Sequence, residues 1–256
     1  MLEARHISKY YSKDGERQQV LADLSLNIGT REFVCLLGPS GCGKSTLLRI
    51  MAGLDSAEEG DVYLDNVRVQ EPQPGCAFVF QDYALFPWKT VLENVAYGME
   101  VQHMYDKNKR LEKAREYLHI MHLGGYENAY IHELSGGMRQ RTAIARSLAL
   151  EPEILFMDEP FGALDNFTRM ELQDLMLDIY RQNKLSVVFV THDISEAIYL
   201  GDRVVVMNAH PGSIHEILDI NKGLVADRTS GDFHLYEDKI MKAFQMVRKR
   251  EIEYFI

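Results

Sequence analysis

Residues 33–45 read Phe33-Val-Cys-Leu-Leu-Gly-Pro-Ser-Gly-Cys-Gly-Lys44-Ser45, an apolar run followed at once by a glycine-rich loop. The loop matches the pattern G-x-x-x-x-G-K-[ST], and a helical stretch, Ser45–Ala52, comes next. In this strand–loop–helix setting, glycines let backbone N–H groups form a concave nest, and the helix start adds its positive dipole end. The stretch therefore predicts a loop that binds nucleotide phosphates.

Within this loop, we expect Lys44 to reach the β- and γ-phosphates and the Ser45 hydroxyl to ligate Mg²⁺. A chance match in a glycine-containing turn is the alternative, and the strand and helix around the loop weigh against it. Cys42 lies beside a helix start, where a thiol can become reactive, but a small side chain tolerated by the loop is the simpler interpretation. The residues predicted to bind the nucleotide here are Gly38, Pro39, Ser40, Gly41, Cys42, Gly43, Lys44, Ser45 and Thr46.

Strand and helix patterns alternate along the rest of the chain. Antiparallel strands are expected before the loop, at Ala4–Tyr11 and Val20–Ile28, and a strand pair turns at Asp65-Asn66. The later strands alternate with helices: strands at Ala77–Phe80, Ile154–Met157, Val187–Val190 and Arg203–Met207, helices at Gly136–Leu150, Asn166–Gln182 and Ile194–Leu200. Such alternation predicts an α/β fold with a mostly parallel sheet, and helical periodicity between Val91 and Leu150 predicts a helical insertion.

The composition limits the class of protein. The chain has 256 residues, a formal net charge of −10, 46 % hydrophobic and 26 % charged residues. These values are typical of a globular protein, exclude intrinsic disorder and disfavour a strongly basic nucleic-acid binder. No apolar run approaches the roughly 20 residues of a membrane-spanning helix, and the N-terminus lacks a signal-peptide core. Three cysteines without metal-ligand spacing fit a reducing cytosol.

Two carboxylates follow the predicted strand Ile154–Met157: Asp158 and Glu159. Parallel sheets bind ligands at the carboxyl ends of their strands, so Asp158 is placed to hold Mg²⁺ and Glu159 to act as general base toward water. An acidic pair at a strand end is by itself usually a solvated turn. The assignment therefore depends on the phosphate loop.

Polar residues follow two other predicted strands. His192 is a candidate for a hydrogen bond to the γ-phosphate, and Gln81 for orienting Mg²⁺ or water. Each would otherwise be an ordinary residue at a strand end. The predicted catalytic residues are Glu159, His192, Lys44 and Gln81, and the predicted Mg²⁺ ligands are Ser45, Gln81 and Asp158.

Leu134-Ser-Gly-Gly-Met-Arg-Gln140 is a second helix start built from small residues, open enough for backbone N–H groups to approach an anion. In isolation, a glycine-rich helix cap is the simpler interpretation. Because one nucleotide needs one phosphate loop, we expect Ser135, Gly136 and Gly137 to complete the site of a neighbouring subunit.

Taken in order, these motifs, with Ala163-Leu-Asp165, resemble those of the nucleotide-binding subunit of ATP-binding cassette (ABC) transporters. The resemblance covers roughly Leu2 to Asp219, and Leu-Ser-Gly-Gly followed by Arg-Gln-Arg resembles the family's signature sequence. It implies an ABC-type phosphate-loop NTPase fold with an N-terminal antiparallel β subdomain, a mostly parallel core sheet and a helical insertion. It also implies ATP and Mg²⁺ as the bound groups and ATP hydrolysis as the activity.

The resemblance implies a division of one ABC ATPase domain, residues 1–256. About 1–92 and 154–222 would form the nucleotide-binding core, about 93–153 a helical signature subdomain, and about 223–256 a helical tail. The tail carries the apolar pattern Ile240, Phe244, Val247.

The resemblance also implies the assembly. A head-to-tail homodimer would hold ATP between the phosphate loop of one copy and Ser135–Gly137 of the other, with Asp165 crossing the seam. Tyr11 would stack on adenine, with neighbouring Tyr10 as the alternative. Tyr83–Trp88 and the helical insertion would receive membrane permease subunits, which link the chain indirectly to an extracytoplasmic solute-binding protein. This arrangement would place the chain at the cytoplasmic face of the inner membrane.

Local matches such as Phe86-Pro-Trp88 and His210-Pro-Gly-Ser-Ile214 resemble the importer branch for nitrate, sulfonate and taurine-type solutes. A soluble, non-transport ABC ATPase acting on ribosomes, DNA or iron–sulfur assembly is the alternative. The chain shows neither the second cassette nor the long coiled coils of such relatives. A nucleotide-binding scaffold without turnover is disfavoured by the intact set of Asp158, Glu159 and His192.

Overall fold

The computed structural model describes residues 1–13 and 16–254, with side chains to residue 244 except that of residue 13. Internal contacts divide the chain into two compact units. The first unit joins Met1–Gln73 to Ser186–Ile256, and the second is Pro74–Leu185.

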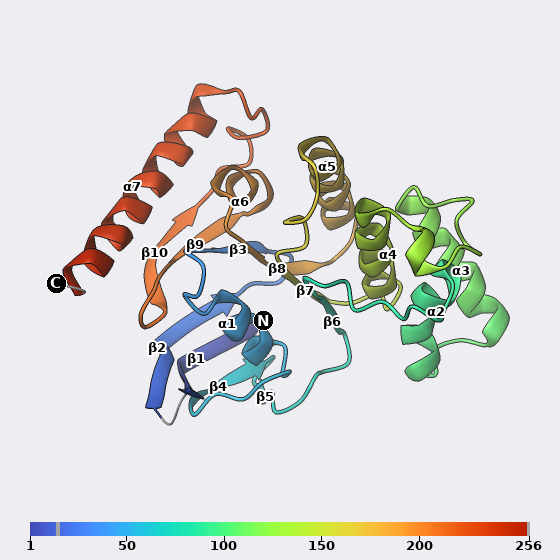
Figure 1. Ribbon diagram of the computed structural model, residues 1–256, viewed down its shortest axis with the longest axis horizontal. Helices are drawn as coiled ribbons and strands as arrows, with labels where there is room; N and C mark the ends of the chain where they lie inside the picture. The colour runs from blue at the N-terminus through green and yellow to red at the C-terminus, as the bar shows by residue number, and fades with distance from the viewer. Residues whose placement is uncertain (14–15, 255–256) are drawn as a thin grey trace. The chain divides into compact units, whose positions relative to one another are not determined.

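The first unit contains a four-stranded antiparallel sheet in the order β2-β1-β4-β5 (Figure 1). In β2, buried Leu24, Leu26 and Ile28 alternate with exposed residues, as expected of a sheet with one covered face. The hairpin extends beyond the predicted strands because its polar ends also pair, as far as Lys13 and Glu16. The strands are β1 (Leu2–Lys13), β2 (Glu16–Ile28), β4 (Glu59–Leu64) and β5 (Val67–Arg68).

The same unit holds a group of buried parallel strands. β3 (Phe33–Leu37) lies between β8 (Ser186–Thr191) and β9 (Arg203–Asn208) and runs parallel to both. β10 (Ser213–Asp219) pairs antiparallel with β9. Every residue of β3 and β8 is buried, as is typical of parallel strands covered on both faces. The residues that follow β3 and β8 therefore leave the sheet at the same edge.

Among its described residues, the first unit has three helices: α1 (Lys44–Met51), α6 (Ile194–Leu200) and α7 (Gly231–Tyr254). Figure 1 shows α7 running beside α6 and the β9–β10 pair, and it packs on all three elements. Ile240 is fully buried and Phe244 is partly buried, so this part of the predicted tail pattern is confirmed. The side chain of Val247 lies outside the described residues.

The second unit combines two parallel strands with a group of helices. β6 (Cys76–Val79) pairs with β7 (Ile154–Asp158), and Ala114, Leu118 and Met121 are fully buried within the helical part. The predicted helix Gly136–Leu150 ends two residues early, at Leu148, because the approach to Pro152 disfavours helical backbone. The helices are α2 (Val91–Val101), α3 (Lys107–Ile120), the 3₁₀ turn η1 (Ile131–Glu133), α4 (Gly136–Leu148) and α5 (Asn166–Gln182).

The predicted α/β class is confirmed: an antiparallel N-terminal sheet, parallel core strands and a helical insertion are all present. In the described part of the chain, no helix is both long enough and apolar enough to span a membrane.

Candidate active site

The phosphate loop lies between β3 and α1 in the first unit. Lys44 is only 5 % exposed, and its Nζ donates to the backbone oxygens of Gly38 (2.8 Å) and Pro39 (3.0 Å). Gly41 and Gly43 have φ angles of 82° and 92°, in the left-handed region that glycine adopts without strain. The loop therefore wraps around the ammonium group of Lys44.

The start of α1 suits an anion. Its N-cap is Gly43, no described side chain caps it, and its first turn carries no acidic residue. The leading N–H groups of a helix need acceptors, and their positive dipole end favours negative charge. Together with the ammonium group of Lys44, this helix start fits a phosphate group.

Cys42 packs inside the loop. Its side chain is fully buried, and its Sγ lies 3.9 Å from Lys44 Nζ. Burial raises the pKa of the thiol, which keeps it protonated and unreactive near neutral pH. The thiol therefore serves as a small packing group.

Tyr11 lies on β1 next to the phosphate loop. Its hydroxyl donates to Asp55 Oδ2 at 2.9 Å and also interacts with the Thr46 side chain. Tyr11 is 44 % exposed, whereas the neighbouring Tyr10 ring is covered by the guanidinium of Arg17 at 4.0 Å. Lys9 Nζ lies 5.2 Å from the centre of the Tyr11 ring, yet of the two tyrosines Tyr11 is the more exposed and interacts with Thr46.

His192 leaves the parallel strands at the same edge as the phosphate loop, because Thr191 of β8 lies opposite Leu37 of β3. The histidine is exposed and stands between a strand end and a helix start. Behind it, the Asp193 N–H donates to Thr191 Oγ1 (3.0 Å), and the Asp193 carboxylate accepts from the Glu196 N–H (3.0 Å). In the first unit, Tyr11 therefore lies beside Thr46, and His192 follows its strand at the edge where the phosphate loop follows β3.

The second unit brings Gln81, Asp158 and Glu159 to one edge, because β6 and β7 are parallel with Val79 opposite Met157. Asp158 is 2 % exposed at the end of β7, and Gln81 is exposed just beyond β6. Glu159 has a φ of 43°, in the left-handed region of backbone conformation.

A cation beside these acids would depend on other ligands. The described residues contain no group of three or more His, Cys, Asp or Glu side chains arranged to hold a metal ion. Mg²⁺ is commonly bound by one or two protein ligands together with substrate phosphates and water. A single buried carboxylate such as Asp158 fits that kind of site.

The second helix start lines a hollow of about 420 Å³ within the second unit. Ser135 caps α4 as predicted, since its Oγ accepts from the Met138 N–H at 3.3 Å. A Cβ on Gly137 would lie 2.9 Å from Thr168 Cγ2, so glycine permits the close approach of α4 and α5. The hollow is lined by Ser135, Gly136, Gly137, Met138, Arg141, Ala163, Leu164, Asp165 and Thr168, with His122, Leu123 and Tyr126.

Asp165 stands at the rim of this hollow as the N-cap of α5. Its carboxylate accepts from the N–H groups of Phe167 and Thr168, both at 3.1 Å. The backbone bond from Thr168 contributes most to lowering the pKa of Asp165. The signature residues and Asp165, far apart in the sequence, therefore border one cavity.

Sequence reasoning missed two residues that shape the segment after Gln81. The guanidinium of Arg146, on α4, donates to the backbone oxygens of Ala84 (2.7 Å) and Tyr83 (2.9 Å). Asn94, fully buried on α2, accepts from the Phe86 N–H (2.8 Å) and donates to Phe86 O (3.1 Å). No local pattern in the sequence marks Asn94 or Arg146 for these contacts.

The segment after Gln81, residues 83–88, presents aromatic side chains and is called the aromatic segment below. Trp88 is 71 % exposed, and its ring centroid lies 5.6 Å from that of Phe86, which in turn contacts Tyr97 at 4.6 Å. A hollow of about 490 Å³ opens beside it, lined by Lys89, Thr90, Leu92, Glu93, Ala96, Glu100, Lys107, Arg110, Leu111 and Asn128.

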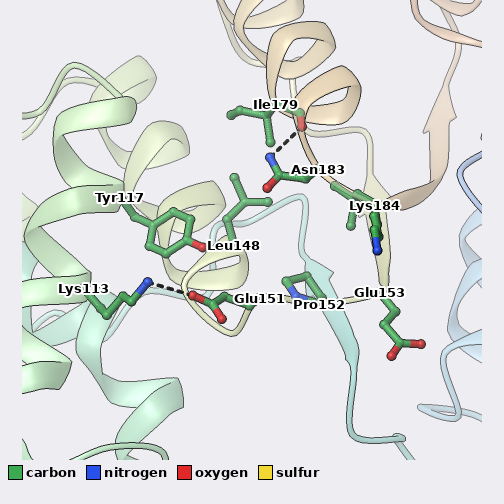
Figure 2. A pocket seen from close by; sticks show the side chains of 10 residues that line it. Lys113, Tyr117, Leu148, Glu151, Pro152, Glu153, Ile179, Asn183 and Lys184 are labelled. Atoms are coloured by element: carbon green, nitrogen blue, oxygen red, sulfur yellow. Dashed lines mark hydrogen bonds and ion pairs between the residues drawn. The ribbon is translucent and has the colours of Figure 1, made fainter.

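A further pocket of about 450 Å³ lies at the other end of β7 (Figure 2). Lys113 Nζ pairs there with Glu151 Oε1 at 3.0 Å, and Tyr117 stands nearby on the same helix. Glu151 and Glu153 precede β7, whereas the catalytic candidates Asp158 and Glu159 end and follow it. This pocket is therefore separate from the acidic edge.

Comparison with protein families adds an independent finding. The model of the family described as "ABC transporter" matches residues 21–162. The chain is 45 % identical to an aliphatic sulfonates import ATP-binding protein, SsuB, of Bacillus thuringiensis subsp. konkukian, covering 93 % of this chain and 94 % of the relative. It is 43 % identical to a nitrate import ATP-binding protein, NrtD, of Synechocystis, covering 93 % and 92 %.

A solved structure has the same architecture. The dimeric post-hydrolysis state of the ATP-binding cassette MJ0796, bound to ADP and Pi, superimposes with a TM-score of 0.78 at 34 % sequence identity. The match covers 86 % of this chain and 99 % of that one.

Proposed function

The chain belongs to the ABC transporter family, and from this membership we infer that it is the ATP-hydrolysing subunit of an importer for a small sulfonate or nitrate-like solute. The observation that carries the inference is the second helix start, Ser135–Gly137, lining a hollow with Asp165. Many nucleotide-binding proteins have a phosphate loop, so the loop alone does not distinguish this family from the others. The second helix start is a separate motif that a phosphate loop does not require. Near-complete coverage of import ATP-binding relatives supports an importer over a soluble, non-transport ATPase.

We propose the following division of roles at the nucleotide. The phosphate loop and Lys44 bind the phosphates, Tyr11 stacks on adenine, and His192 donates to the γ-phosphate. Glu159 takes a proton from the attacking water as general base. Ser45, Gln81 and Asp158 would hold Mg²⁺, which supplies charge neutralisation at the phosphate oxygens.

We propose a head-to-tail homodimer in which Ser135, Gly136 and Gly137 of one copy meet the nucleotide on the phosphate loop of the other. The geometry of α4 supports this: its first turn carries no acidic residue, and small residues leave its N–H groups approachable. The dimeric state of the MJ0796 cassette is consistent with such an assembly.

We propose that permease subunits dock on the aromatic segment around Trp88 and the adjacent hollow on α2 and α3. A largely exposed tryptophan beside an open hollow is typical of a protein interface. The chain would then act at the cytoplasmic face of the membrane through these partners. The permease and its solute-binding protein, rather than this chain, would select the solute.

Substitution of Glu159 tests the hydrolytic assignment. In the transporter assembled with its permease, Glu159→Gln should reduce ATP turnover by at least about 100-fold while ATP binding is retained, because only the general base is lost. Glu153→Gln, an exposed glutamate at the other end of β7, is the matched control and should retain wild-type turnover. Unchanged turnover in Glu159→Gln would contradict the assignment.

A further inference from the structure

Helix α6 begins two residues after His192, with Asp193 between them as its N-cap, and is too short to be stable alone. It has seven residues, about two turns, and isolated helices shorter than roughly 12 residues are marginal in water. The link before it is tightly bonded: Thr191 Oγ1 donates to Glu196, and Asp193 caps the first turn. Any support given to α6 is therefore transmitted to the short link that carries His192.

The C-terminal segment holds the far end of α6. Lys222 Nζ donates to the backbone oxygens of Ile198 (3.2 Å) and Tyr199 (2.8 Å), in the last turn of the helix. A cation at this end satisfies carbonyl groups and complements the helix dipole. Arg228 adds a cation–π contact, with its guanidinium carbon 3.6 Å from the centre of the Tyr199 ring.

Helix α7 holds the near end of α6. Ser195 Oγ donates to Glu237 Oε1 at 2.6 Å, and His234 Nδ1 bonds Glu237 Oε2 at 2.9 Å. Burial would raise the pKa of Glu237, but the bonds from Ser195 and His234 outweigh it and lower the pKa, which keeps the acceptor ionised. Phe233 is 2 % exposed and Ile240 fully buried, so α7 is anchored on both sides of Glu237.

We propose that the C-terminal segment Lys222–Ile240 is a positioning device for His192, with Lys222 and Glu237 as the positioning residues that hold α6 at its two ends. The proposal rests on the proposed function, in which His192 contacts the γ-phosphate. Lys44 Nζ is held by two backbone oxygens of its own loop, those of Gly38 and Pro39, and neither bond involves α6. Loosening α6 should therefore lower kcat and leave the KM for ATP unchanged.

The principal test compares two substitutions of Glu237 in the transporter assembled with its permease. Glu237→Ala should lower kcat about fivefold or more, with KM for ATP changed by less than about twofold. Glu237→Gln keeps an oxygen that accepts from Ser195 and should recover most of the rate. Asp238→Ala, at the next, exposed position of α7, is the matched control and should retain the wild-type rate.

Ser195→Ala removes the same bond from the α6 side, and alanine favours helix. It should reproduce the Glu237→Ala effect even where loss of Glu237 impairs folding. A rise in KM without loss of kcat, or equal losses in Asp238→Ala, would overturn the proposal.

His192→Ala separates failure of the proposal from failure of the proposed function. Unchanged turnover in His192→Ala would refute the role of His192 itself. Loss of turnover in His192→Ala with wild-type kcat in both Glu237→Ala and Ser195→Ala would refute only the positioning role. In the His192→Ala background, Glu237→Ala should lower the residual rate no further, and a repeated fivefold loss would show that α7 acts by another route.

Discussion

Asp55 links the predicted adenine-binding tyrosine to a buried cation. Its carboxylate accepts from Lys9 Nζ and from the Tyr11 hydroxyl, each at 2.9 Å. The Lys9 side chain is only 6 % exposed, and its ammonium group also lies 2.6 Å from Ser56 O and 3.6 Å from Glu58 Oε1, so loss of the Asp55 carboxylate would remove one of the partners of a buried cation. Burial would raise the pKa of Asp55, but the bonds from Lys9, Tyr11 and the Ser56 N–H together lower it.

This lowered pKa predicts a pH dependence of stability. Because the folded-state pKa lies below the ordinary value of 3.8, the contribution of ionised Asp55 is complete above about pH 5 and is lost as the pH falls through the lowered pKa. Asp55→Asn should be less stable than wild type near neutral pH and should lose less further stability on acidification. Urea unfolding at a series of pH values measures both effects, with Asp82→Asn, an exposed aspartate, as the control. Equal acid sensitivity in wild type and Asp55→Asn would contradict this role.

At the scale of elements, α2 organises the aromatic segment through one amide. Besides its bonds to Phe86, Asn94 Nδ2 lies within hydrogen-bonding distance of the backbone oxygens of Lys89 (3.2 Å) and Thr90 (3.0 Å). Because the Asn94 side chain is fully buried, water cannot readily take over its hydrogen bonds to these backbone groups. The shape of the proposed permease surface therefore depends on a residue behind it.

Asn94→Ala should lower the free energy of unfolding by about 2–4 kcal/mol, because several buried backbone groups lose their partner at once. Asn94→Asp should be at least as destabilising, since it keeps an acceptor for the Phe86 N–H but turns an oxygen toward backbone carbonyls. Chemical denaturation measures both variants, with Glu100→Ala on the exposed face of the same helix as the control. A midpoint close to wild type in Asn94→Ala would rule out this organising role.

The elements that could be predicted from the sequence are those whose signals are local. The run Phe33–Leu37 next to the glycine loop predicts strand, loop and helix, and Ser135 before two glycines predicts the cap of α4. The contacts that shape the sites are between distant residues. Arg146 donates hydrogen bonds to the backbone of Tyr83 and Ala84, and Lys222 donates to the end of α6. Neither residue lies in a sequence pattern from which its partner could be predicted. Their roles follow from tertiary packing, which periodicity does not encode.

At the scale of the whole molecule, the chain carries two helix starts suited to phosphate, α1 and α4, and the proposed dimer uses one from each copy. Gly136 allows this to be tested without disturbing the fold. A Cβ there would lie 3.8 Å from the Tyr83 hydroxyl oxygen, an ordinary contact, and an acidic residue in the first turn suits the helix dipole. Gly136→Asp should therefore fold normally but repel a phosphate, and Gly136→Asn is the uncharged control.

Complementation between two defective chains distinguishes a shared site from one built within a single chain. In the Glu159→Gln background, which blocks hydrolysis, Lys44→Ala removes the phosphate lysine of one chain and Gly136→Asp spoils the second helix start of the other. Homodimers of either kind should retain almost no ATP after gel filtration. A mixed dimer, purified through two different tags, has one site in which both damaged elements meet and one in which both intact elements meet. It should therefore retain about one nucleotide, against about two for the background alone. If each site used only its own chain, both sites of the mixed dimer would be damaged, and it would retain none.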